Sequence, residues 1–380
     1  MLSSELDSAA IQDSARPWVS VVIATYNSED KLQPLLRSLA GQVAPKKQDR
    51  MQVLVVDGGS TDLTKEIAKE YGAAVIDNPE TNAISAKSIG FRASQARYVV
   101  FLDHDERLVD SRSLIRKISL MQSDPSIRCV FTSGYKVDDA DSASNSYASA
   151  FGDPLSLYLY RQTCLEGRID VIRKRFRILS ENSDAIVLVA NSNTRSVLLE
   201  IAACGGMVDK QFVLDSHKQT SDDANLFIQL FYLLGANGCQ DSFAVMKNDP
   251  IIHESVDSWT SVFVKIRWRV RNAISDPFKV GASGISGRDK SLDNQIATRV
   301  RRIRLNIKKA MFVPYSVLVF PALIDSMSLA IRRRKVGYLM HVPLSIFVIW
   351  VSLLTLFQRF TPSQVKQVHY DGTRVDTVQK

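Results

Sequence analysis

The sequence lacks the glycine-rich signatures by which two large groups of proteins hold nucleotide phosphates. It contains neither G-x-G-x-x-G nor G-x-x-x-x-G-K-[ST], which excludes the Rossmann dinucleotide cradle and the P-loop. Cysteine is also scarce, because the 380 residues include only four, at positions 129, 164, 204 and 239, without C-x-x-C spacing. Such scattered cysteines predict reduced side chains and exclude a zinc site or a disulfide framework.

The N-terminus has acidic residues and no apolar h-region, so we expect no secretory signal there. The formal charge of +8 is unevenly distributed, since Lys and Arg concentrate in residues 265–310 and 332–335, beside the most apolar part of the chain. Nucleic-acid-binding proteins also carry such clusters. Basic residues that flank long apolar segments are more typical of the cytoplasmic surface of a membrane. We therefore expect a membrane partner and no nucleic acid.

Apolar, β-branched runs alternate with helical patterns through the first 110 residues. Strands are expected over 18–25, 53–56, 73–77 and 98–102, and helices over 31–42, from 63 onward and over 84–96. This alternation predicts a doubly wound, parallel α/β sheet, in which ligands bind at the carboxyl ends of the strands. Polar residues follow three of these ends, at Thr25–Glu29, Asp57 and Asp103–Asp105.

The strand expected at 98–102 stops abruptly at three carboxylates, Asp103, Asp105 and Glu106. Asp103 and Asp105 are two residues apart and share a face of an extended chain, so they suit a hard divalent cation whose shell a diphosphate completes. An acidic turn after a strand is also a common solvated feature. The convergence of three polar strand ends favours a ligand site for a sugar nucleotide.

Three ordered motifs resemble the N-terminal half of family 2 glycosyltransferases, the inverting enzymes of GT-A fold: VVIATYNSEDKLQPLLRSL, VLVVDGGSTD and AKSIGFRASQARYVVFLDHDERL. The resemblance extends over about residues 18–275. It implies a GT-A domain, which is a Rossmann-like, doubly wound and mostly parallel sheet. It also implies that a nucleotide-sugar donor is held by six residues: Thr25, Tyr26, Glu29, Asp57, Lys87 and Asp103.

The same resemblance implies a divalent metal cofactor, Mg²⁺ or Mn²⁺, bound by Asp103 and Asp105. His253 is a further implied metal ligand, because a late histidine helps to bind metal or diphosphate in many GT-A enzymes. An isolated histidine also fits an ordinary surface or core position. Lys87-Ser88 stands where the family often has Arg-Asn, and Lys87 keeps the positive charge.

Residues 221–238 carry an apolar helical stripe with Asp222 and Asp223 at its N-terminus, where the helix dipole favours carboxylates. Helix capping explains both acids. The stretch is also similar to the Glu-Asp-x-Asp-Leu-x-x-Arg helix of the family, which implies that Asp223 is the catalytic base. Val264 stands where the Gln-x-x-Arg-Trp motif of processive synthases has Gln, so we expect transfer of a single sugar.

Two apolar segments lie near the C-terminus. Residues 337–357 contain no Asp, Glu, Lys or Arg and are long enough for a transmembrane helix. Residues 311–330 contain two prolines and Asp325, which are costly against lipid. This segment either crosses the membrane or forms a re-entrant or interfacial element. Burial of both segments in a soluble domain is the remaining alternative.

The sequence thus predicts a polar leader over 1–14, a GT-A domain over 15–275, a basic juxtamembrane region over 276–310, membrane-associated segments over 311–358 and a polar tail over 359–380. The expected function is that of a membrane-anchored inverting glycosyltransferase, which moves one sugar to a membrane-associated glycan or lipid-linked acceptor. We expect it at the inner (plasma) membrane, with the catalytic domain in the cytoplasm. A polyprenyl-phosphate sugar synthase and an inactive membrane scaffold are the alternatives.

Overall fold

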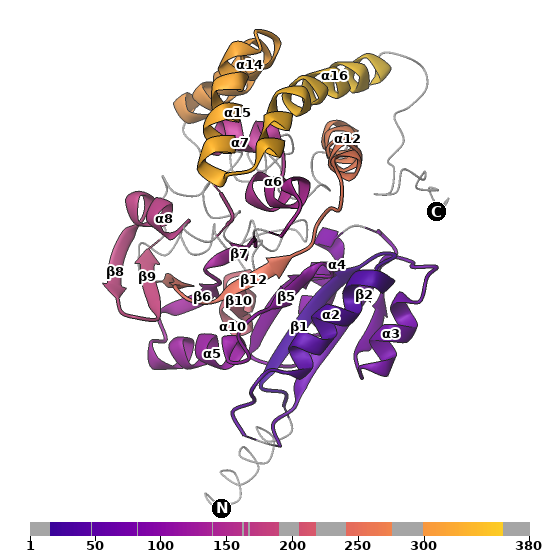
Figure 1. Cartoon of the computed structure of the whole chain (residues 1–380). Coiled ribbons are helices and arrows are strands. Elements are labelled where there is room, and N and C mark those ends of the chain that lie inside the picture. The colour runs from indigo at the N-terminus through magenta and orange to yellow at the C-terminus, as the bar shows by residue number, and fades with distance from the viewer. Residues whose placement is uncertain are drawn as a thin grey trace, which may run out of the picture. The chain divides into compact units, whose positions relative to one another are not determined.

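The computed structural model describes residues 16–46, 48–81, 83–138, 140–161, 163–165, 168–189, 205–217, 241–275 and 299–359. The chain divides into two compact units. Figure 1 shows the whole chain, coloured by residue number. The first comprises Met1–Gly134 and Ile169–His253, and the second comprises Tyr135–Arg168 and Glu254–Lys380. The second unit therefore joins an internal segment to the C-terminal helices, and the boundaries expected at 275 and 310 stay predictions from the sequence.

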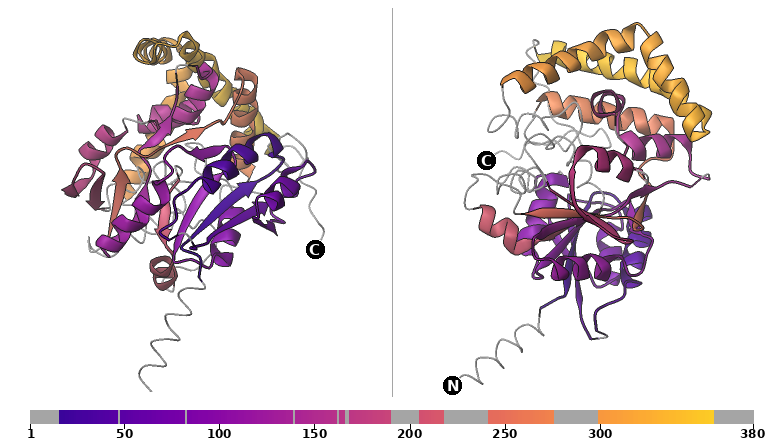
Figure 2. Two further views of the ribbon diagram at one scale, coloured as in Figure 1. Left: turned by 60° about the horizontal axis from the view of Figure 1, so that its bottom comes forward. Right: turned by 90° about the vertical axis from the view of Figure 1, so that its left-hand side faces the viewer.

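The first unit is built on a large sheet with the strand order β3–β2–β1–β4–β10–β6–β11–β9–β8. Strands β3, β2, β1 and β4 run parallel, and β10 is antiparallel to β4 and β6. The expected α/β fold with a large central sheet is confirmed, and Figure 2 shows the sheet from two further directions. Its strands are β1 (Val19–Thr25), β2 (Met51–Asp57), β3 (Ala74–Asp77), β4 (Tyr98–Asp103), β6 (Ile127–Phe131), β8 (Arg177–Glu181), β9 (Ala185–Val189), β10 (Met207–Asp209) and β11 (Ser242–Met246).

The burial of the central strands explains their continuous apolar sequences. All seven residues of β1 are buried, as expected for a parallel strand covered on both faces. A Cβ atom on Gly90 would lie 2.2 Å from Cγ1 of Val22 and 3.1 Å from Cγ2 of Val56, so glycine lets its helix lie directly on β1 and β2. The helices of this unit are α2 (Glu29–Ala40), α3 (Thr64–Glu70), α4 (Ala83–Ala93), α5 (Ser113–Ser123), α8 (Ile169–Arg175) and α10 (Lys210–His217).

A second, smaller sheet forms next to the acidic strand end. Strand β5 (Glu106–Leu108) pairs antiparallel with β12 (Pro250–His253), and the register places His253 opposite Glu106. Strand β7 (Gly134–Lys136) follows β6 along the chain. The antiparallel pairing brings a histidine that is about 150 positions away in the sequence to the turn that carries Asp105.

The second unit is helical and has an aromatic core. Tyr147 is fully buried, and its ring centroid lies 5.5 Å from that of Phe151 and 5.7 Å from that of Tyr338. The helices are α6 (Ala143–Phe151), α7 (Pro154–Tyr160), α12 (Trp259–Ser275), α14 (Arg299–Val317), α15 (Phe320–Arg333), η1 (Val336–Met340) and α16 (His341–Arg359). Asp153 caps α7 by accepting a hydrogen bond from the backbone amide of Ser156 at 2.8 Å.

The apolar C-terminal segments differ from each other in shape. In the described part of the chain, Val336–Gln358 is the one helical stretch of 23 residues that is long and apolar enough to cross a membrane, with a mean hydropathy of 2.1. The preceding segment does not form a straight span. Helices α14 and α15 meet at an angle of 85°, with Pro314 on one side of the bend and Pro321 on the other.

Candidate active site

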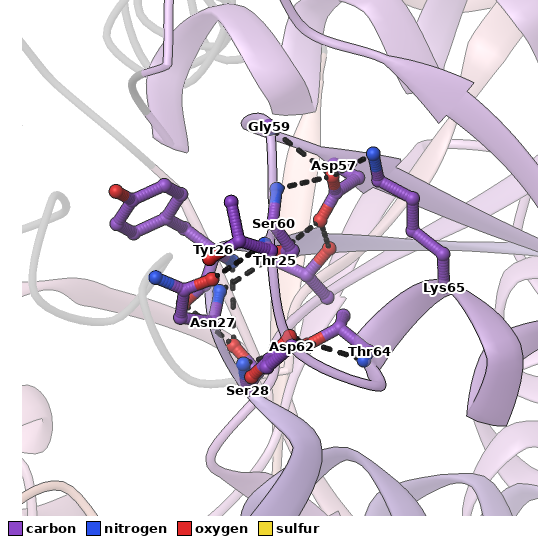
Figure 3. A network of polar contacts seen from close by, with 11 residues as sticks. Thr25, Tyr26, Asn27, Ser28, Asp57, Gly59, Ser60, Asp62, Thr64 and Lys65 are labelled. Atoms are coloured by element: carbon purple, nitrogen blue, oxygen red, sulfur yellow. Dashed lines mark hydrogen bonds and ion pairs between the residues drawn. The ribbon is translucent and has the colours of Figure 1, made fainter.

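The first loop of the candidate site is organised by the buried carboxylate of Asp57, at the end of β2 (Figure 3). Its Oδ2 accepts hydrogen bonds from the backbone amides of Gly59 at 3.0 Å and Ser60 at 2.8 Å. Its Oδ1 accepts from the hydroxyls of Ser60 at 2.5 Å and Thr25 at 3.1 Å. Lys65 lies 3.6 Å from Oδ2. One carboxylate therefore joins the ends of β1 and β2.

The loops after β1 and β2 also cap each other's helices. Asp62 accepts a hydrogen bond from the backbone amide of Glu29 at the start of α2, at 3.2 Å. Glu29 in return accepts from the backbone amide of Leu63, just before α3, at 2.9 Å. Burial raises the pKa of Asp62, but hydrogen bonds from the Thr64 hydroxyl and from the amides of Glu29 and Thr64 outweigh it and lower the pKa. The charged carboxylate is thus the form that this contact favours.

The remaining polar residues of the first loop continue this network. The backbone amide of Asn27 donates to the Ser60 hydroxyl at 2.8 Å, and the amide of Ser28 donates to the Thr64 hydroxyl at 2.7 Å. Figure 3 shows that the ring of Tyr26 points away from the Asp57 carboxylate. Thr25 and Asp57, which are both predicted nucleotide contacts, are therefore hydrogen-bonded to each other. Tyr26 lies on the same hydrogen-bonded loop.

The end of β4 carries a second cluster, in which a lysine faces the acidic turn. Lys87 of α4 lies 2.7 Å from Oδ1 of Asp103, and its side chain is 16% exposed. Glu106 is buried, and its Oε2 accepts a hydrogen bond from the backbone amide of Asp103 at 3.0 Å. Burial lowers the pKa of Lys87, but the charges of Asp103, Glu106 and Asp105 outweigh it and raise the pKa. Lys87 is therefore a fixed cation at this strand end.

The two remaining predicted metal ligands lie side by side. Nε2 of His253 is 3.4 Å from Oδ2 of Asp105, and the two side chains are 12% and 9% exposed. In the described residues, no three His, Cys, Asp or Glu side chains converge tightly enough to form a complete metal shell. A hard cation such as Mg²⁺ often takes one or two carboxylates and completes its shell with phosphate and water. Asp105 and His253 fit such a partial protein site.

Several predicted positions lie outside the described residues. These are the implied catalytic base Asp223 and its neighbour Asp222. Their roles stay predictions from the sequence. Conversely, sequence reasoning missed the contacts of Asp62 with Glu29 and of Glu106 with the amide of Asp103. The available signal was an acidic residue in each turn, but its partner is set by the tertiary fold.

The N-terminal part of the chain is similar to known sequences. Residues 20–163 match the model of Glycosyl transferase family 2, which confirms the resemblance over these residues. Glycosyltransferase AglE of Haloferax volcanii is 36% identical over 98 residues, which cover 24% of this chain and 32% of that protein. Poly(ribitol-phosphate) beta-N-acetylglucosaminyltransferase TarS of Staphylococcus aureus is 34% identical over 93 residues, which cover 23% of this chain and 16% of that protein. The chain thus spans about a third or less of the length of these relatives.

Solved structures that are similar over most of the chain have low sequence identity. The structure of S. aureus TarS 1–349 in complex with UDP covers 86% of this chain and 90% of its own, with 14% identity and a TM-score of 0.42. Mannosyltransferase PcManGT from Pyrobaculum calidifontis, in complex with GDP-Man and Mn²⁺, covers 91% of this chain and 89% of its own, with 14% identity and a TM-score of 0.46.

Proposed function

We propose that the protein is an inverting glycosyltransferase that moves a single sugar from a nucleotide-sugar donor to a membrane-associated glycan or lipid-linked acceptor. The main support is the grouping of polar side chains at the carboxyl ends of parallel strands, where α/β sheets bind their ligands. Thr25 and Asp57 are in contact at the ends of β1 and β2, and Asp103 lies opposite Lys87 at the end of β4. The family match over residues 20–163 agrees with this assignment.

In this proposal the two clusters hold different parts of the donor. The loop that carries Tyr26 and Glu29, made rigid by Asp57, would bind the base and the ribose. Lys87 is a permanently charged group placed to neutralise phosphate oxygens, and Asp103 orients it. Asp105 and His253 would bind a Mg²⁺ or Mn²⁺ ion. When bound, such an ion stabilises negative charge on the departing diphosphate.

The chemical step requires a base, because an acceptor hydroxyl is a poor nucleophile at neutral pH. We assign this role to Asp223 from the sequence resemblance. Its carboxylate would accept the hydroxyl proton while the acceptor oxygen forms the new glycosidic bond and the bond to the diphosphate breaks. The nucleoside diphosphate then leaves with the electron pair of the broken bond. One displacement of this kind inverts the anomeric configuration.

Membrane association would explain the apolar and basic sequences of the C-terminal unit. The apolar helical stretch Val336–Gln358 is long enough to serve as an anchor, and arginines and a lysine precede it at 332–335. An anchor of this kind would hold the transferase at the inner membrane, with the catalytic unit in the cytoplasm beside the basic residues. The acceptor would then be a lipid or a lipid-linked glycan that is confined to the same surface.

Titration of the full chain in detergent with UDP and GDP, with and without Mn²⁺, tests the donor site. One of the nucleotides should bind more tightly with Mn²⁺. In Asp105→Ala and His253→Ala, loss of a metal ligand should weaken that binding about 10- to 100-fold. Asp215→Ala, which changes an exposed carboxylate on α10, should bind as the unmodified chain does. Unchanged affinity in both site variants would remove Asp105 and His253 from the site.

A further inference from the structure

The C-terminal helices of the second unit expose many large apolar side chains, and they bury polar side chains beside apolar ones such as Phe312, Leu344 and Val348. Their buried positions include small or polar side chains, and these are Ser316, Ser326, His341, Ser345 and Thr355. Large apolar side chains instead face outward on all three helices. They include Val313, Ile324, Met327, Ile331, Trp350, Leu353 and Phe357. Large apolar side chains exposed in this number indicate an interaction surface.

The bend between α14 and α15 exposes a run of consecutive apolar residues. Val317, Leu318 and Phe320 are 62%, 68% and 68% exposed. The backbone turns at Val319, whose φ of 61° is rare for a β-branched residue. The amide of Leu318 still donates to the Pro314 carbonyl, at 3.0 Å, so part of the turning backbone is internally bonded. The result is a pair of helices bent by 85° at an apolar apex, Val317–Phe320, and we call this pair the α14–α15 hairpin.

Both ends of this hairpin return to the same part of the unit. Near its start, Lys308 donates a hydrogen bond to the carbonyl oxygen of Leu159 at the end of α7. Just after its end, Lys335 donates to the carbonyl oxygens of Asp138 and Asp141 before α6, at 3.2 and 2.6 Å. Both ends of the bent pair are therefore held by the 135–168 segment of the same unit.

The carboxylate within the hairpin faces the inside of the unit. Asp325 accepts a hydrogen bond from the Tyr315 hydroxyl at 2.7 Å and pairs with Arg161 at 2.6 Å. The Tyr315 oxygen also lies 2.7 Å from Nε2 of His341, whose Nδ1 lies 2.7 Å from the Tyr147 hydroxyl. The one acid of this segment is therefore satisfied by protein groups and adds no unpaired charge to the apolar outer surface.

We infer that the α14–α15 hairpin is a re-entrant element that inserts its apex, Val317–Phe320, into one leaflet of a membrane with an anionic surface. The partner follows from the charges beside the apex. Lys309 lies near one end of the hairpin and Arg332, Arg333 and Arg334 near the other, and these cations suit anionic headgroups while the apex reaches the acyl chains. This inference rests on the proposed membrane association and is independent of the transferase activity.

The test places an environment-sensitive fluorescent amino acid at position 318 of the full chain, which is reconstituted in vesicles of 30% phosphatidylglycerol and 70% phosphatidylcholine. We expect a blue-shifted emission that lipids with doxyl-labelled acyl chains quench. The matched control is the same amino acid in place of Val43, an exposed apolar residue of the first unit, which should show neither effect. Absence of lipid quenching at 318 would overturn the proposal.

Two further positions distinguish re-entry from a crossing. The fluorescent residue placed at 309 or at 334 should in both cases be quenched by iodide added from the side on which position 43 is quenched. Accessibility of 309 together with protection of 334 would establish a crossing and overturn the inference. Equal lipid quenching at 318 in vesicles of pure phosphatidylcholine would overturn the anionic requirement.

A second copy of the chain is the other candidate occupant of this surface. It would give a blue shift at 318 in lipid-free buffer that rises with protein concentration, in parallel with a dimer detected by sedimentation. That result, without doxyl quenching in vesicles, would assign the apex to self-association and overturn the lipid proposal. Measurement of sugar transfer on the same samples keeps this outcome separate from a failure of the proposed enzymatic function.

Discussion

Replacing Asp57 tests whether one buried carboxylate holds the donor loop in place. In Asp57→Asn the side-chain oxygen can still accept from the amides of Gly59 and Ser60. The new NH₂ group can donate to the hydroxyl oxygens of Thr25 and Ser60, because hydroxyls can accept as well as donate. The four contacts are thus kept in number. What is lost is the charge that strengthens them.

The cost follows from the difference between charged and neutral hydrogen bonds. A bond to a charged group contributes about 1.5–3 kcal/mol and a neutral one about 0.5–1.5 kcal/mol, so two amide bonds lose about 2 kcal/mol in Asp57→Asn. In Asp57→Ala the buried amide of Ser60 and the hydroxyls of Thr25 and Ser60 lose the carboxylate that accepts from them. We expect that change to lower the free energy of unfolding of the first unit by about 3–5 kcal/mol.

Hydrogen–deuterium exchange and the thermal midpoint measure these effects. The amides of Gly59 and Ser60 should exchange faster in Asp57→Asn and faster again in Asp57→Ala. Asp77→Asn is the matched control, because Asp77 is exposed at the neighbouring end of β3, in register with Asp57. Its effect should stay within about 0.5 kcal/mol. If Asp57→Ala left both amides as protected as in the unmodified chain, the organising role of Asp57 would be refuted.

Three further changes test other parts of the account. Lys87→Gln should weaken binding of a nucleoside diphosphate about 10-fold or more in calorimetry, whereas Lys87→Arg should retain most of it, since only the first removes the cation. Lys117 and Asp249 form a fully buried ion pair, so Lys117→Met should cost about 3–5 kcal/mol in denaturant unfolding, and adding Asp249→Leu should recover much of that loss. Asp223→Asn should bind donor normally but transfer sugar roughly 10²–10⁴-fold more slowly, and Asp222→Asn should not; equal rates in the two would count against a base at Asp223.

The central strands of the parallel half of the sheet, β1 and β4, were predictable because each is buried and then stops at polar residues. The expected strand at 98–102 is β4, and the expected strand at 73–77 is β3. A strand buried on both faces needs an uninterrupted apolar sequence, and acidic residues follow where the chain leaves the core. The sequence pattern therefore predicts both the strand and the polar residues at its end. The positions of Thr25, Asp57 and Asp103 at strand ends follow from the same logic.

The remaining contacts depend on tertiary structure that no local pattern encodes. Glu29 and Asp62 are 33 residues apart, and they interact only because the loops that carry them follow the neighbouring strands β1 and β2. His253 reaches Asp105 through the antiparallel pairing of β5 and β12. Leu155, Leu157 and Leu159 of α7 are buried in the second unit.

Turnover of nucleotide sugars by the full chain tests the central claim most directly. The purified protein in lipid vesicles would be offered a panel of UDP- and GDP-sugars with Mn²⁺, and release of the nucleoside diphosphate would be followed with and without membrane lipid extract as acceptor. We predict metal-dependent release from one donor, which the extract increases and Asp105→Ala abolishes. The absence of turnover of every donor, by protein that binds nucleotide and Mn²⁺, would contradict the enzymatic account and favour the inactive scaffold.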